Sequence, residues 1–428
     1  MGLLKKLFHF KLALLAYWWY GRPSRKLIVV GVTGTKGKST TCRLISSVLE
    51  AGGQKVGMLS TVEFQIGEKR WLNDKKMTML GRGEIQKMLK QMVQAGCRYV
   101  VVETSSQGIL QYRHYGLNYD VVVFTNLAPE HVEAHGGFEN LKRDKGIIFA
   151  QLMKQAKKVF DNKKVPKVAV VNIDDQHSDY YLQFSADEKF GFGIKNTKPN
   201  LKNITGKILA STETGSEFSV NNHNYHINIL GDFNVYNALA AIAVAKSQNI
   251  PEEKIDSGLK NVKLIEGRME VVNPGQDFKV IVDYAHEPLS LTELFTNLRK
   301  MLGPTGKLIG LVGSDGGGRD KSKREKMGEI AGRLCDVVII TDVNCFDEDP
   351  NQIAEMLAVG ARHANKTNNE NLFIEVDRRR AIEKAITMAK AGDIIAITAK
   401  GTEPCIVVAN GKKIPWDDRQ VAKEILCQ

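Results

Sequence analysis

A glycine-rich loop, GVTGTKGKST at residues 31–40, constrains this chain more than any other feature of its sequence. It lies directly between a β-branched apolar run and an amphipathic segment, so we expect a strand before it and a helix after it. Glycines let backbone N–H groups close around phosphate oxygens, and the start of a helix adds the positive end of its dipole. The loop is one residue longer than the pattern GxxxxGK followed by Ser or Thr. Its position between a strand and a helix still predicts a phosphate-binding site.

Individual residues of this loop have distinct expected roles. Lys38 would reach the terminal phosphates of a nucleotide, and Ser39 or Thr40 would hold magnesium. The other cofactor-binding candidates in the loop are Gly34, Thr35, Lys36 and Gly37. A glycine-rich turn without a nucleotide is the weaker interpretation, because a conformationally costly loop that ends in Lys-Ser has little purely structural use.

Short apolar runs alternate with longer amphipathic stretches from Leu27 onward. The strand-like runs are LIVVGV, YVVVET, DVVVFTN, KVAVVN, KVIVDYA, KLIGLVGS, DVVIITD and DIIAITAKG. Runs of this length suit strands buried on both faces, and their alternation with helices predicts an α/β protein with parallel sheets. A polar, β-rich stretch at residues 201–230 predicts an antiparallel insertion or edge, and NVYNALAAIAVAKSQ predicts a helix after it.

At 428 residues the chain exceeds the length of one ordinary domain. We expect a basic, aromatic segment at 1–26, a central P-loop-type parallel-sheet domain at 27–265, and a C-terminal Rossmann-like α/β domain at 266–428. The boundary is placed near Glu266, where the second series of strand-like runs begins. Without a low-complexity linker, the two domains are expected to meet across a cleft and to move as rigid bodies.

Charge and cysteine usage narrow the functional class. The net charge of +12 is spread along the chain, which favours anionic small substrates over nucleic acid. The cysteines stand far apart without a CxxC pair, which argues against a zinc site or disulfides and for a reducing cytosol. A cytoplasmic protein is therefore expected.

The segment at residues 1–26 is basic and apolar. Its hydrophobic run is interrupted by Lys11 and is shorter than the ~20 residues that span a bilayer. Trp18, Trp19 and Tyr20 are residue types that settle at interfaces. We therefore expect this segment to pack on the protein or to make peripheral contact with a membrane surface.

Further candidates lie at the ends of strand-like runs or in the segments that follow them. Glu103 ends the run YVVVE, where a carboxylate at the carboxyl end of a parallel strand can coordinate magnesium; a strand-end salt bridge is the alternative. His131 and His135 are four residues apart, a helical spacing, although Pro129 and the following glycines argue for a loop. The sequence around Lys145 does not by itself indicate a function for this residue, because most lysines on helices are simply solvated.

Together these motifs resemble the Mur ligases. The motifs GTKGKS (34–39), ETSSQ (103–107), TNL (125–127), EH (130–131), EGRME (266–270), DYAH (283–286), DRRR (377–380) and KGTE (400–403) occur in that family's order. The resemblance covers roughly residues 27–410 and is strongest to the branch that adds the third residue of the peptidoglycan stem.

The resemblance implies a set of site residues. It makes Lys38, Glu103, His131 and Lys145 catalytic, with Ser39, Thr40, Glu103, His131 and a carbamylated Lys145 binding two Mg²⁺ ions. On the ATP side it places Asn237, Arg268, Asp283 and His286; on the muramoyl-peptide side, Thr78, Ser105, Ser106 and Arg113; and around the incoming amino acid, Asn344, Phe346 and Glu403. The chain would be a monomer that acts on small molecules and binds no nucleic acid.

The chemistry that the resemblance implies is amide-bond formation. A carboxylate of the acceptor, the D-Glu of UDP-MurNAc-L-Ala-D-Glu or an analogue, would attack the γ-phosphate of ATP to form an acyl phosphate. An incoming amine would then displace phosphate. Phosphoryl transfer depends mainly on positioning and charge neutralisation, which the loop, Lys38 and magnesium would supply.

Departures from the family pattern bear on the substrates. Only about 26 residues precede the first strand, so the usual domain that grips uridine diphosphate is expected to be missing. Phe346 stands where diaminopimelate enzymes have an arginine, and phenylalanine cannot pair with the distal carboxylate. The neighbouring Asp347, Glu348 and Asp349 would suit a cationic side chain such as lysine, or form an ordinary exposed acidic turn. Thr402 also replaces a histidine that is common in the family.

The sequence is also compatible with other functions. The acceptor could be polyglutamyl or lipid-linked rather than a UDP-sugar, as in a folylpolyglutamate or poly-γ-glutamate synthetase. An inactive nucleotide-binding partner subunit is a third possibility, disfavoured because Lys38, Glu103, His131 and Lys145 are all kept. Nucleic-acid binding has only the net charge in its favour.

Overall fold

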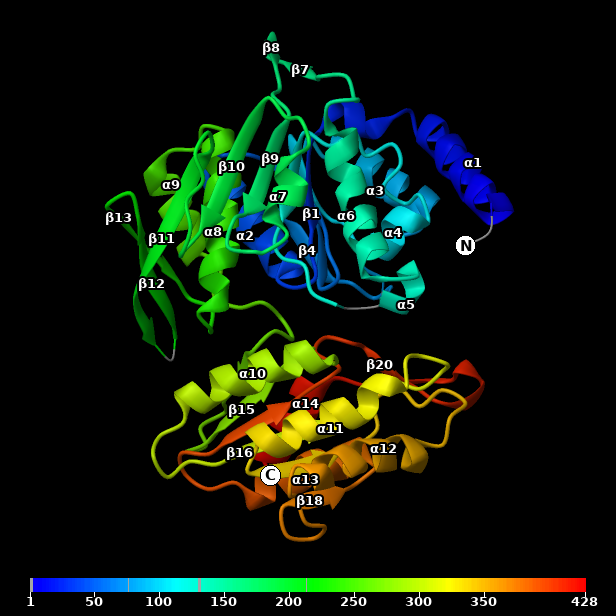
Figure 1. Ribbon diagram of the computed structural model, residues 1–428, viewed down its shortest axis with the longest axis vertical. Helices are drawn as coiled ribbons and strands as arrows, with labels where there is room; N and C mark the ends of the chain where they lie inside the picture. Colours follow the sequence, from blue (N-terminus) through cyan, green and yellow to red (C-terminus); the bar gives the residue numbers. More distant parts are fainter. Residues whose placement is uncertain (1–2, 76, 130–131, 213) are drawn as a thin grey trace. The chain divides into compact units, whose positions relative to one another are not determined.

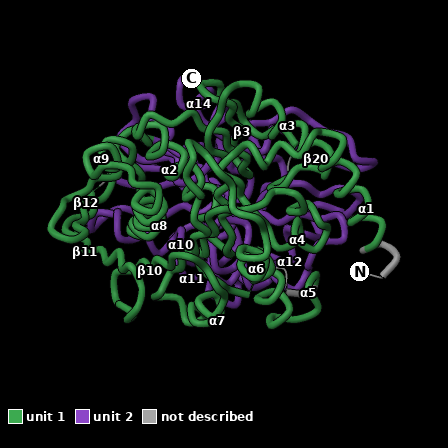
Figure 2. Tube along the Cα trace, turned by 90° about the horizontal axis from the view of Figure 1, so that it is seen from above, with its two compact units in different colours: residues 1–263 green, residues 264–428 purple. Residues whose placement is uncertain are grey.

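The computed structural model describes residues 3–75, 77–129, 132–212 and 214–428. The chain divides into two compact units, which we call unit 1 (residues 1–263) and unit 2 (residues 264–428) (Figure 2). Each unit is a layered α/β structure with a mainly parallel sheet, as the alternation of apolar runs and amphipathic stretches predicts. The predicted α/β fold class is thus confirmed.

Within the described residues, unit 1 is built on an 11-stranded sheet in the order β13-β12-β11-β10-β9-β6-β1-β5-β2-β3-β4. The strands from β11 to β2 in this order pair in parallel, and the strands outside them are antiparallel. The predicted antiparallel edge at 201–230 is confirmed as β11, β12 and β13. The strand bounds are β1 (Ile28–Thr33), β2 (Val56–Leu59), β3 (Glu63–Ile66), β4 (Lys69–Leu72), β5 (Tyr99–Glu103), β6 (Val121–Phe124), β9 (Val168–Asn172), β10 (Glu188–Gly193), β11 (Lys202–Thr212), β12 (Gly215–Val220) and β13 (His223–Ile227), with a separate hairpin of β7 (Val159–Phe160) and β8 (Lys163–Lys164).

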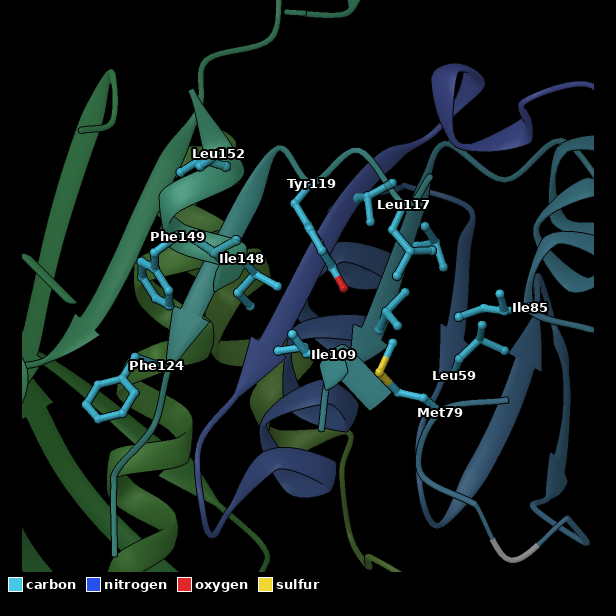
Figure 3. Close-up of a cluster of buried hydrophobic side chains, with 14 of the residues drawn as sticks. Leu59, Met79, Ile85, Ile109, Leu117, Tyr119, Phe124, Ile148, Phe149 and Leu152 are labelled. Atoms are coloured by element: carbon cyan, nitrogen blue, oxygen red, sulfur yellow. The ribbon is translucent and has the colours of Figure 1, made fainter. Parts of the chain in front are cut away.

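Helices cover both faces of this sheet (Figure 1). One face carries α2, α8 and α9, which pack against one another, and the other carries α3, α4 and α6. The core beneath α3 and α6 is formed by alternate residues of the parallel strands, including Val29 and Val122, together with Ile85, Phe149 and Tyr119 (Figure 3). The helix bounds are α1 (Leu3–Trp19), η1 (Pro23–Lys26), α2 (Lys38–Ala51), α3 (Arg82–Gln94), α4 (Ser106–Leu110), α5 (Val132–His135), α6 (Phe138–Leu152), α7 (Ser178–Leu182), α8 (Phe233–Ser247) and α9 (Glu252–Lys260).

Unit 2 contains a 6-stranded sheet in the order β14-β15-β19-β16-β17-β18, in which only β14 is antiparallel to its neighbour. Helices α13 and α14 pack on one face of this sheet. The bounds are β14 (Glu270–Val272), β15 (Lys279–Val282), α10 (Pro288–Met301), β16 (Leu308–Val312), α11 (Ser322–Leu334), β17 (Val337–Ile340), α12 (Pro350–His363), β18 (Leu372–Ile374), α13 (Arg378–Met388), β19 (Ile394–Ile397), β20 (Cys405–Val407), η2 (Ala409–Gly411), β21 (Lys413–Pro415) and α14 (Asp418–Leu426).

The register of unit 1 explains where its polar residues gather. β1 lies between β5 and β6, with Val32 beside Glu103 and Thr33 beside Phe124. The glycine loop follows β1, and Thr125 follows β6, so these segments emerge at the same edge of the sheet. Ligands of open parallel sheets bind at the carboxyl ends of the strands. The fold therefore places the loop, Glu103 and the segment after β6 together.

Candidate functional site

The glycine loop of unit 1 has a conformation that requires two of its glycines. Gly34 and Gly37 have backbone φ angles of 149° and 77°, which residues with a side chain rarely adopt. A Cβ atom at Gly34 would lie 1.9 Å from Oγ1 of Thr125, and one at Gly37 would lie 2.3 Å from Oδ1 of Asn237. The loop is thus pressed against two neighbouring segments, and the predicted cofactor residue Asn237 lies against it.

Helix α2 begins immediately after this loop without a side-chain cap. Its N-cap residue is Gly37, which offers no side-chain acceptor to the first N–H groups of the helix. Such a helix start attracts anions through its N–H groups and its dipole. The half-buried Lys38 folds back over the loop, where its Nζ donates to the carbonyl of Thr35 at 2.8 Å. These groups together can hold a phosphate.

Residues that follow β6 support the loop from behind. The Thr35 amide donates to the Asn126 carbonyl, and the Lys36 amide donates to Asn126 Oδ1, each at 2.9 Å. Thr125 donates its hydroxyl to the Lys36 carbonyl at 2.7 Å. In the sequence, Thr125 and Asn126 stand out only as part of the TNL motif. Their position at the end of a strand is the local signal that they lie next to the loop.

Glu103 is the buried carboxylate next to the loop, with a side chain that is almost inaccessible. Its Oε2 accepts a hydrogen bond from Ser39 Oγ at 2.8 Å and another from the Thr61 amide at 2.7 Å. Of the two hydroxyl residues predicted to hold magnesium, Ser39 is therefore the one that shares a hydrogen bond with Glu103. A carboxylate and a hydroxyl oxygen in contact are the hard ligands that Mg²⁺ prefers.

Lys145 reaches the loop from α6. It is buried, and its Nζ donates to the Gly34 carbonyl at 2.7 Å. The described residues contain no group of three or more His, Cys, Asp or Glu side chains that could hold a metal by themselves. A cation at Ser39 and Glu103 would therefore need phosphate or water oxygens to complete its shell, as Mg²⁺ commonly does. His131, the predicted ligand of a second ion, lies outside the described residues.

His135 ends the short helix α5, so the loop that Pro129 and the glycines suggested there is wrong for residues 132–135. Its buried ring bonds through Nδ1 to Oδ2 of Asp144 at 2.7 Å. Asp144 precedes Lys145 in α6. The histidine thus holds α5 against the helix that carries Lys145.

The four residues predicted to contact the muramoyl peptide lie on connected loops. Thr78 accepts a hydrogen bond from the Thr61 hydroxyl at 3.0 Å, and the Thr61 amide donates to Glu103. Ser105 caps α4 by accepting from the Gly108 amide at 3.2 Å, and the buried Ser106 is the first residue of that helix. Arg113 contacts Met77 Sδ at 3.4 Å, one residue from Thr78.

A second arginine, Arg82, belongs to this region and was not predicted. Arg113 donates to Gln111 Oε1 at 2.6 Å, and Arg82 donates to the Gln111 carbonyl at 2.9 Å. Burial lowers the pKa of both guanidinium groups, and the charge of Arg113 lowers the pKa of Arg82 further. Two guanidinium groups that meet at Gln111 make this region positively charged, which suits an anionic ligand.

In unit 2, Asn344 is the centre of a charged cluster at the ends of β16, β17 and β19. Its Nδ2 donates to Asp315 Oδ1 at 2.7 Å and to Glu403 Oε2 at 3.0 Å. Its Oδ1 accepts from the fully buried Lys400 at 3.2 Å, and Lys400 also donates to Glu403 at 2.9 Å. Asp315 and Lys400 were missed as site residues. Their positions just after strands were the available signal.

Phe346 lies beside this cluster in a strained backbone conformation, with a φ of 52°. The Arg319 guanidinium carbon lies 5.6 Å from the centre of its ring, and Arg319 also forms an ion pair with Asp315. A Cβ atom at Gly317 would come within 2.8 Å of the ring. The aromatic ring therefore fills the space next to the glycines that follow β16.

The acidic turn after Phe346 is occupied by internal partners. Asp347 accepts from the Asn410 amide at 2.7 Å, and Asp349 caps α12 by accepting from the Asn351 amide. Glu348 pairs with the buried Arg324 and with Lys321, each at 3.1 Å. Hydrogen bonding from Arg324 lowers the pKa of Glu348 to about 2. These contacts favour the ordinary acidic turn over a binding surface for a cationic side chain.

The remaining predicted residues of unit 2 lie around the end of β15. The half-buried Asp283 accepts from the amides of Met269 at 2.8 Å and Ala285 at 2.7 Å, and desolvation raises the pKa of its carboxyl group. Arg268 stacks 4.6 Å from the centre of the Tyr284 ring, whose other neighbour is His286, with ring centres 4.5 Å apart. Arg268, Asp283 and His286 are thus gathered at one place in unit 2.

Two features define the class of this protein. Unit 1 has an uncapped helix start behind a glycine loop with a buried Ser–Glu pair, the arrangement of a nucleotide-phosphate site. Unit 2 presents paired carboxylates and cations at the ends of parallel strands. The chain is a two-unit α/β nucleotide-binding protein.

Comparison with known proteins identifies its family. The Mur ligase middle domain matches residues 32–245, and the Mur ligase, glutamate ligase domain matches residues 267–401. The UDP-N-acetylmuramyl-tripeptide synthetase of Roseiflexus sp. (strain RS-1) is 37% identical over 97% of this chain and 82% of that protein. The UDP-N-acetylmuramoyl-L-alanyl-D-glutamate--2,6-diaminopimelate ligase of Geobacillus kaustophilus (strain HTA426) is 35% identical over 96% and 81%. The chain belongs to the Mur ligase family, whose members are ATP-dependent amide-bond-forming ligases that use Mg²⁺.

Solved structures share the fold. A UDP-N-acetylmuramoyl-L-alanyl-D-glutamate--2,6-diaminopimelate ligase aligns with a TM-score of 0.60 and 27% identity, covering 94% of this chain and 78% of that one. The folylpolyglutamate synthase of Mycobacterium tuberculosis complexed with ADP aligns with a TM-score of 0.67 at 16% identity, over 91% of each chain, which shows the fold alone.

Proposed function

We propose that this chain joins an amino acid to the D-Glu carboxylate of UDP-MurNAc-L-Ala-D-Glu, or of a close analogue, through an acyl phosphate. The observation that carries the proposal is the Ser39–Glu103 hydrogen bond of 2.8 Å at the foot of an uncapped helix and a glycine loop. The names of relatives that match along nearly the whole chain supply the substrate class.

The phosphoryl step uses groups of unit 1. The loop amides and the start of α2 would bind the phosphates, and Lys38 would leave the Thr35 carbonyl to neutralise charge on the transferred group. Magnesium, held by Ser39 and Glu103, would supply a Lewis acid on the phosphate oxygens. The acceptor carboxylate attacks the γ-phosphorus and ADP leaves.

Lys145 is proposed to act as a carbamate. Its ammonium group would first lose a proton; the neutral amine would then add to CO₂ and release a second proton, which leaves a carbamate anion with two oxygen ligands. Its buried contact with the Gly34 carbonyl places the amine beside the phosphate loop, where an anion that binds metal has a use. A lysine that stayed cationic would serve only as a further phosphate contact.

The acceptor is proposed to lie along Thr78, Ser105, Ser106 and Arg113. Arg82 would add a second positive charge for its carboxylates or phosphates, since both arginines meet at Gln111. Burial lowers the pKa values of both guanidinium groups, and an anionic ligand bound beside them would favour their charged forms.

The incoming amino acid is proposed to bind at Asn344 and Glu403. The cluster offers the carboxylates of Asp315 and Glu403 for an α-ammonium group. Phe346 presents an aromatic ring where a distal carboxylate would need a cation. We therefore expect an amino acid whose side chain lacks a distal carboxylate. The engaged acidic turn gives no separate support for lysine.

The deciding experiment measures phosphate release from ATP and Mg²⁺ with UDP-MurNAc-L-Ala-D-Glu and one amino acid at a time. Release that needs both the acceptor and one amine is expected. Lys38→Ala should abolish it, whereas Lys207→Ala, which removes an exposed lysine of the same unit, should not. Release only with polyglutamyl or lipid-linked acceptors would overturn the acceptor assignment. ATP binding without release for any acceptor would favour a nucleotide-binding partner subunit.

A further inference from the structure

Helix α1 is apolar on two opposite sides, and only one of them packs on the protein. Phe10 and Tyr17 contact the Tyr115 ring, with ring centres 5.0 and 6.3 Å apart, and Ala13 between them is buried. Residues 10, 13 and 17 recur at helical spacing, so they form one stripe that faces unit 1. Asn118 fixes the end of this stripe by donating to the Tyr17 hydroxyl at 3.0 Å.

The opposite side, which we call the outer face, consists of Leu7, Phe8, Lys11, Leu12, Leu15, Trp18 and Trp19. All of these side chains are exposed, to 66% for Leu15 and 83% for Trp19. Their spacing of three and four residues makes them a single continuous strip. A strip of large apolar side chains in water is costly, and such strips mark surfaces that contact something apolar.

The charged residues around the outer face indicate which kind of apolar partner it contacts. Residues 1–49 contain no aspartate or glutamate, and residues 1–26 contain six lysines and arginines. Lys11, Arg25 and Lys26 are exposed, and the Arg22 guanidinium stacks 4.5 Å from the Trp18 ring centre. The neighbouring helix α3 adds the exposed Lys87 and Lys90 and, in its first turn, the half-buried Glu84.

We propose that the outer face of α1 docks this protein on the surface of an anionic lipid bilayer. A helix with apolar and tryptophan side chains on one face, and with only lysine and arginine as charged residues in the surrounding segment 1–26, is typical of segments that lie in the interface plane. A second copy of the chain fits less well, because its α1 would bring the same positive charge to the contact.

The helix is suited to lying on a bilayer and unsuited to crossing one. Its 17 residues span about 26 Å at 1.5 Å each, less than the ~30 Å hydrocarbon core. Along the described part of the chain, no helix is both long and apolar enough to cross a membrane. Lys11 at mid-face could extend its ammonium group to the headgroups.

The inner stripe joins the docking surface to the proposed acceptor region. His9 bonds to Arg82 through Nδ1 at 2.5 Å, and the Phe10 ring packs edge-on against Tyr112, next to Arg113. A bilayer beneath α1 would therefore lie close to the segment proposed to bind the acceptor. The docking itself does not depend on that acceptor assignment.

The test measures co-sedimentation of the full chain with vesicles of phosphatidylcholine alone or mixed with phosphatidylglycerol, at low and high salt. We expect binding to the mixed vesicles that weakens with salt. The double variant L15E/W19E should bind at least tenfold more weakly, as should K11Q/R25Q, which removes charge alone. The matched control V159E/L209E changes two exposed apolar residues elsewhere in unit 1 and should bind like the wild type.

Circular dichroism and phosphate release should be unchanged in L15E/W19E, because both side chains are exposed on the face of α1 that does not pack on the rest of unit 1. Absence of binding to the mixed vesicles overturns the proposal, as does equal binding by L15E/W19E and the wild type. A concentration-dependent dimer that L15E/W19E abolishes, without vesicle binding, would assign the outer face to a second copy instead.

Discussion

Lys145 and Gly34 are joined by a hydrogen bond of 2.7 Å between the lysine Nζ and the glycine carbonyl, across 111 residues of sequence. The lysine comes from the middle of α6 and the glycine from the loop after β1. A buried ammonium group that contacts the loop backbone holds the phosphate loop and α6 in a fixed relation. The same nitrogen is the atom that we propose to carry the carbamate.

Replacement of Lys145 by alanine should lower phosphate release by roughly 100-fold or more, the cost of losing one preorganised electrostatic group at a reacting phosphate. A small carboxylic acid such as acetate should restore part of the rate by supplying the missing anion. Arg143→Ala, an exposed change in the same helix, should leave the rate unchanged. A labelled carbamate carbon should appear by ¹³C NMR in bicarbonate. A wild-type rate for Lys145→Ala would make the residue structural.

Phe346→Arg should allow diaminopimelate to serve as the incoming amine. A guanidinium group at this position could pair with the distal carboxylate, and a charge-assisted hydrogen bond contributes about 1.5 kcal/mol or more, roughly tenfold in kcat/KM. Arginine would occupy the same left-handed backbone conformation as phenylalanine, so stability should change little. Phe346→Leu is the matched control and should gain nothing. Equal use of diaminopimelate by the wild type would contradict the role of Phe346.

A buried ion pair should dominate the stability of unit 2. Arg378 makes two hydrogen bonds of 2.7 Å to Asp418, and it also donates to the carbonyls of Asp342 and Thr398. Arg378→Ala would leave a buried carboxylate unpaired, so the free energy of unfolding should fall by about 3–5 kcal/mol. Arg379→Ala breaks an exposed pair with Glu424 and should lower the stability far less than Arg378→Ala does. Amide hydrogen exchange of β16 and β17 would measure the loss of stability in each of the two variants.

Much of the fold follows from local pattern. The apolar runs predicted β1, β5 and β6 because strands buried on both faces need continuous apolar sequence, and the antiparallel edge from β11 to β13 followed from its polar alternation. The glycine loop could be interpreted from the sequence because the residues expected to bind phosphate are neighbours along the chain. The sequence pattern did not predict the helix α5 at 132–135. The segment is short, and the nearby proline and glycines are residues that favour a loop.

The site was less predictable where contacts join distant segments. Nothing local distinguishes Lys145 from a solvated lysine, and only the resemblance indicated it. Arg82 lies at the start of a helix and Asp315 follows a strand end, and both are close to predicted site residues only in the folded chain. Their spacing in the sequence does not indicate this proximity. The internal partners of the acidic turn, such as Arg324 for Glu348, also come from elsewhere in unit 2. Such pairings depend on tertiary packing, which a single sequence encodes only indirectly.

The Glu348 pair should make the stability of unit 2 depend on pH. Hydrogen bonding from Arg324 lowers the pKa of Glu348 to about 2, below the ordinary value of about 4.3. The unfolded chain then binds the proton more tightly, so the contribution is present above about pH 4.3 and is lost as the pH falls toward 2. The carboxylate is partly exposed, which reduces the contribution to about 1–2 kcal/mol. Hydrogen exchange of β16 amides at pH 7 and pH 3 should show this loss in the wild type and in the exposed control Glu370→Gln. Glu348→Gln should be less stable at pH 7 and lose less on acidification, whereas an identical pH response would mean that the pair contributes nothing.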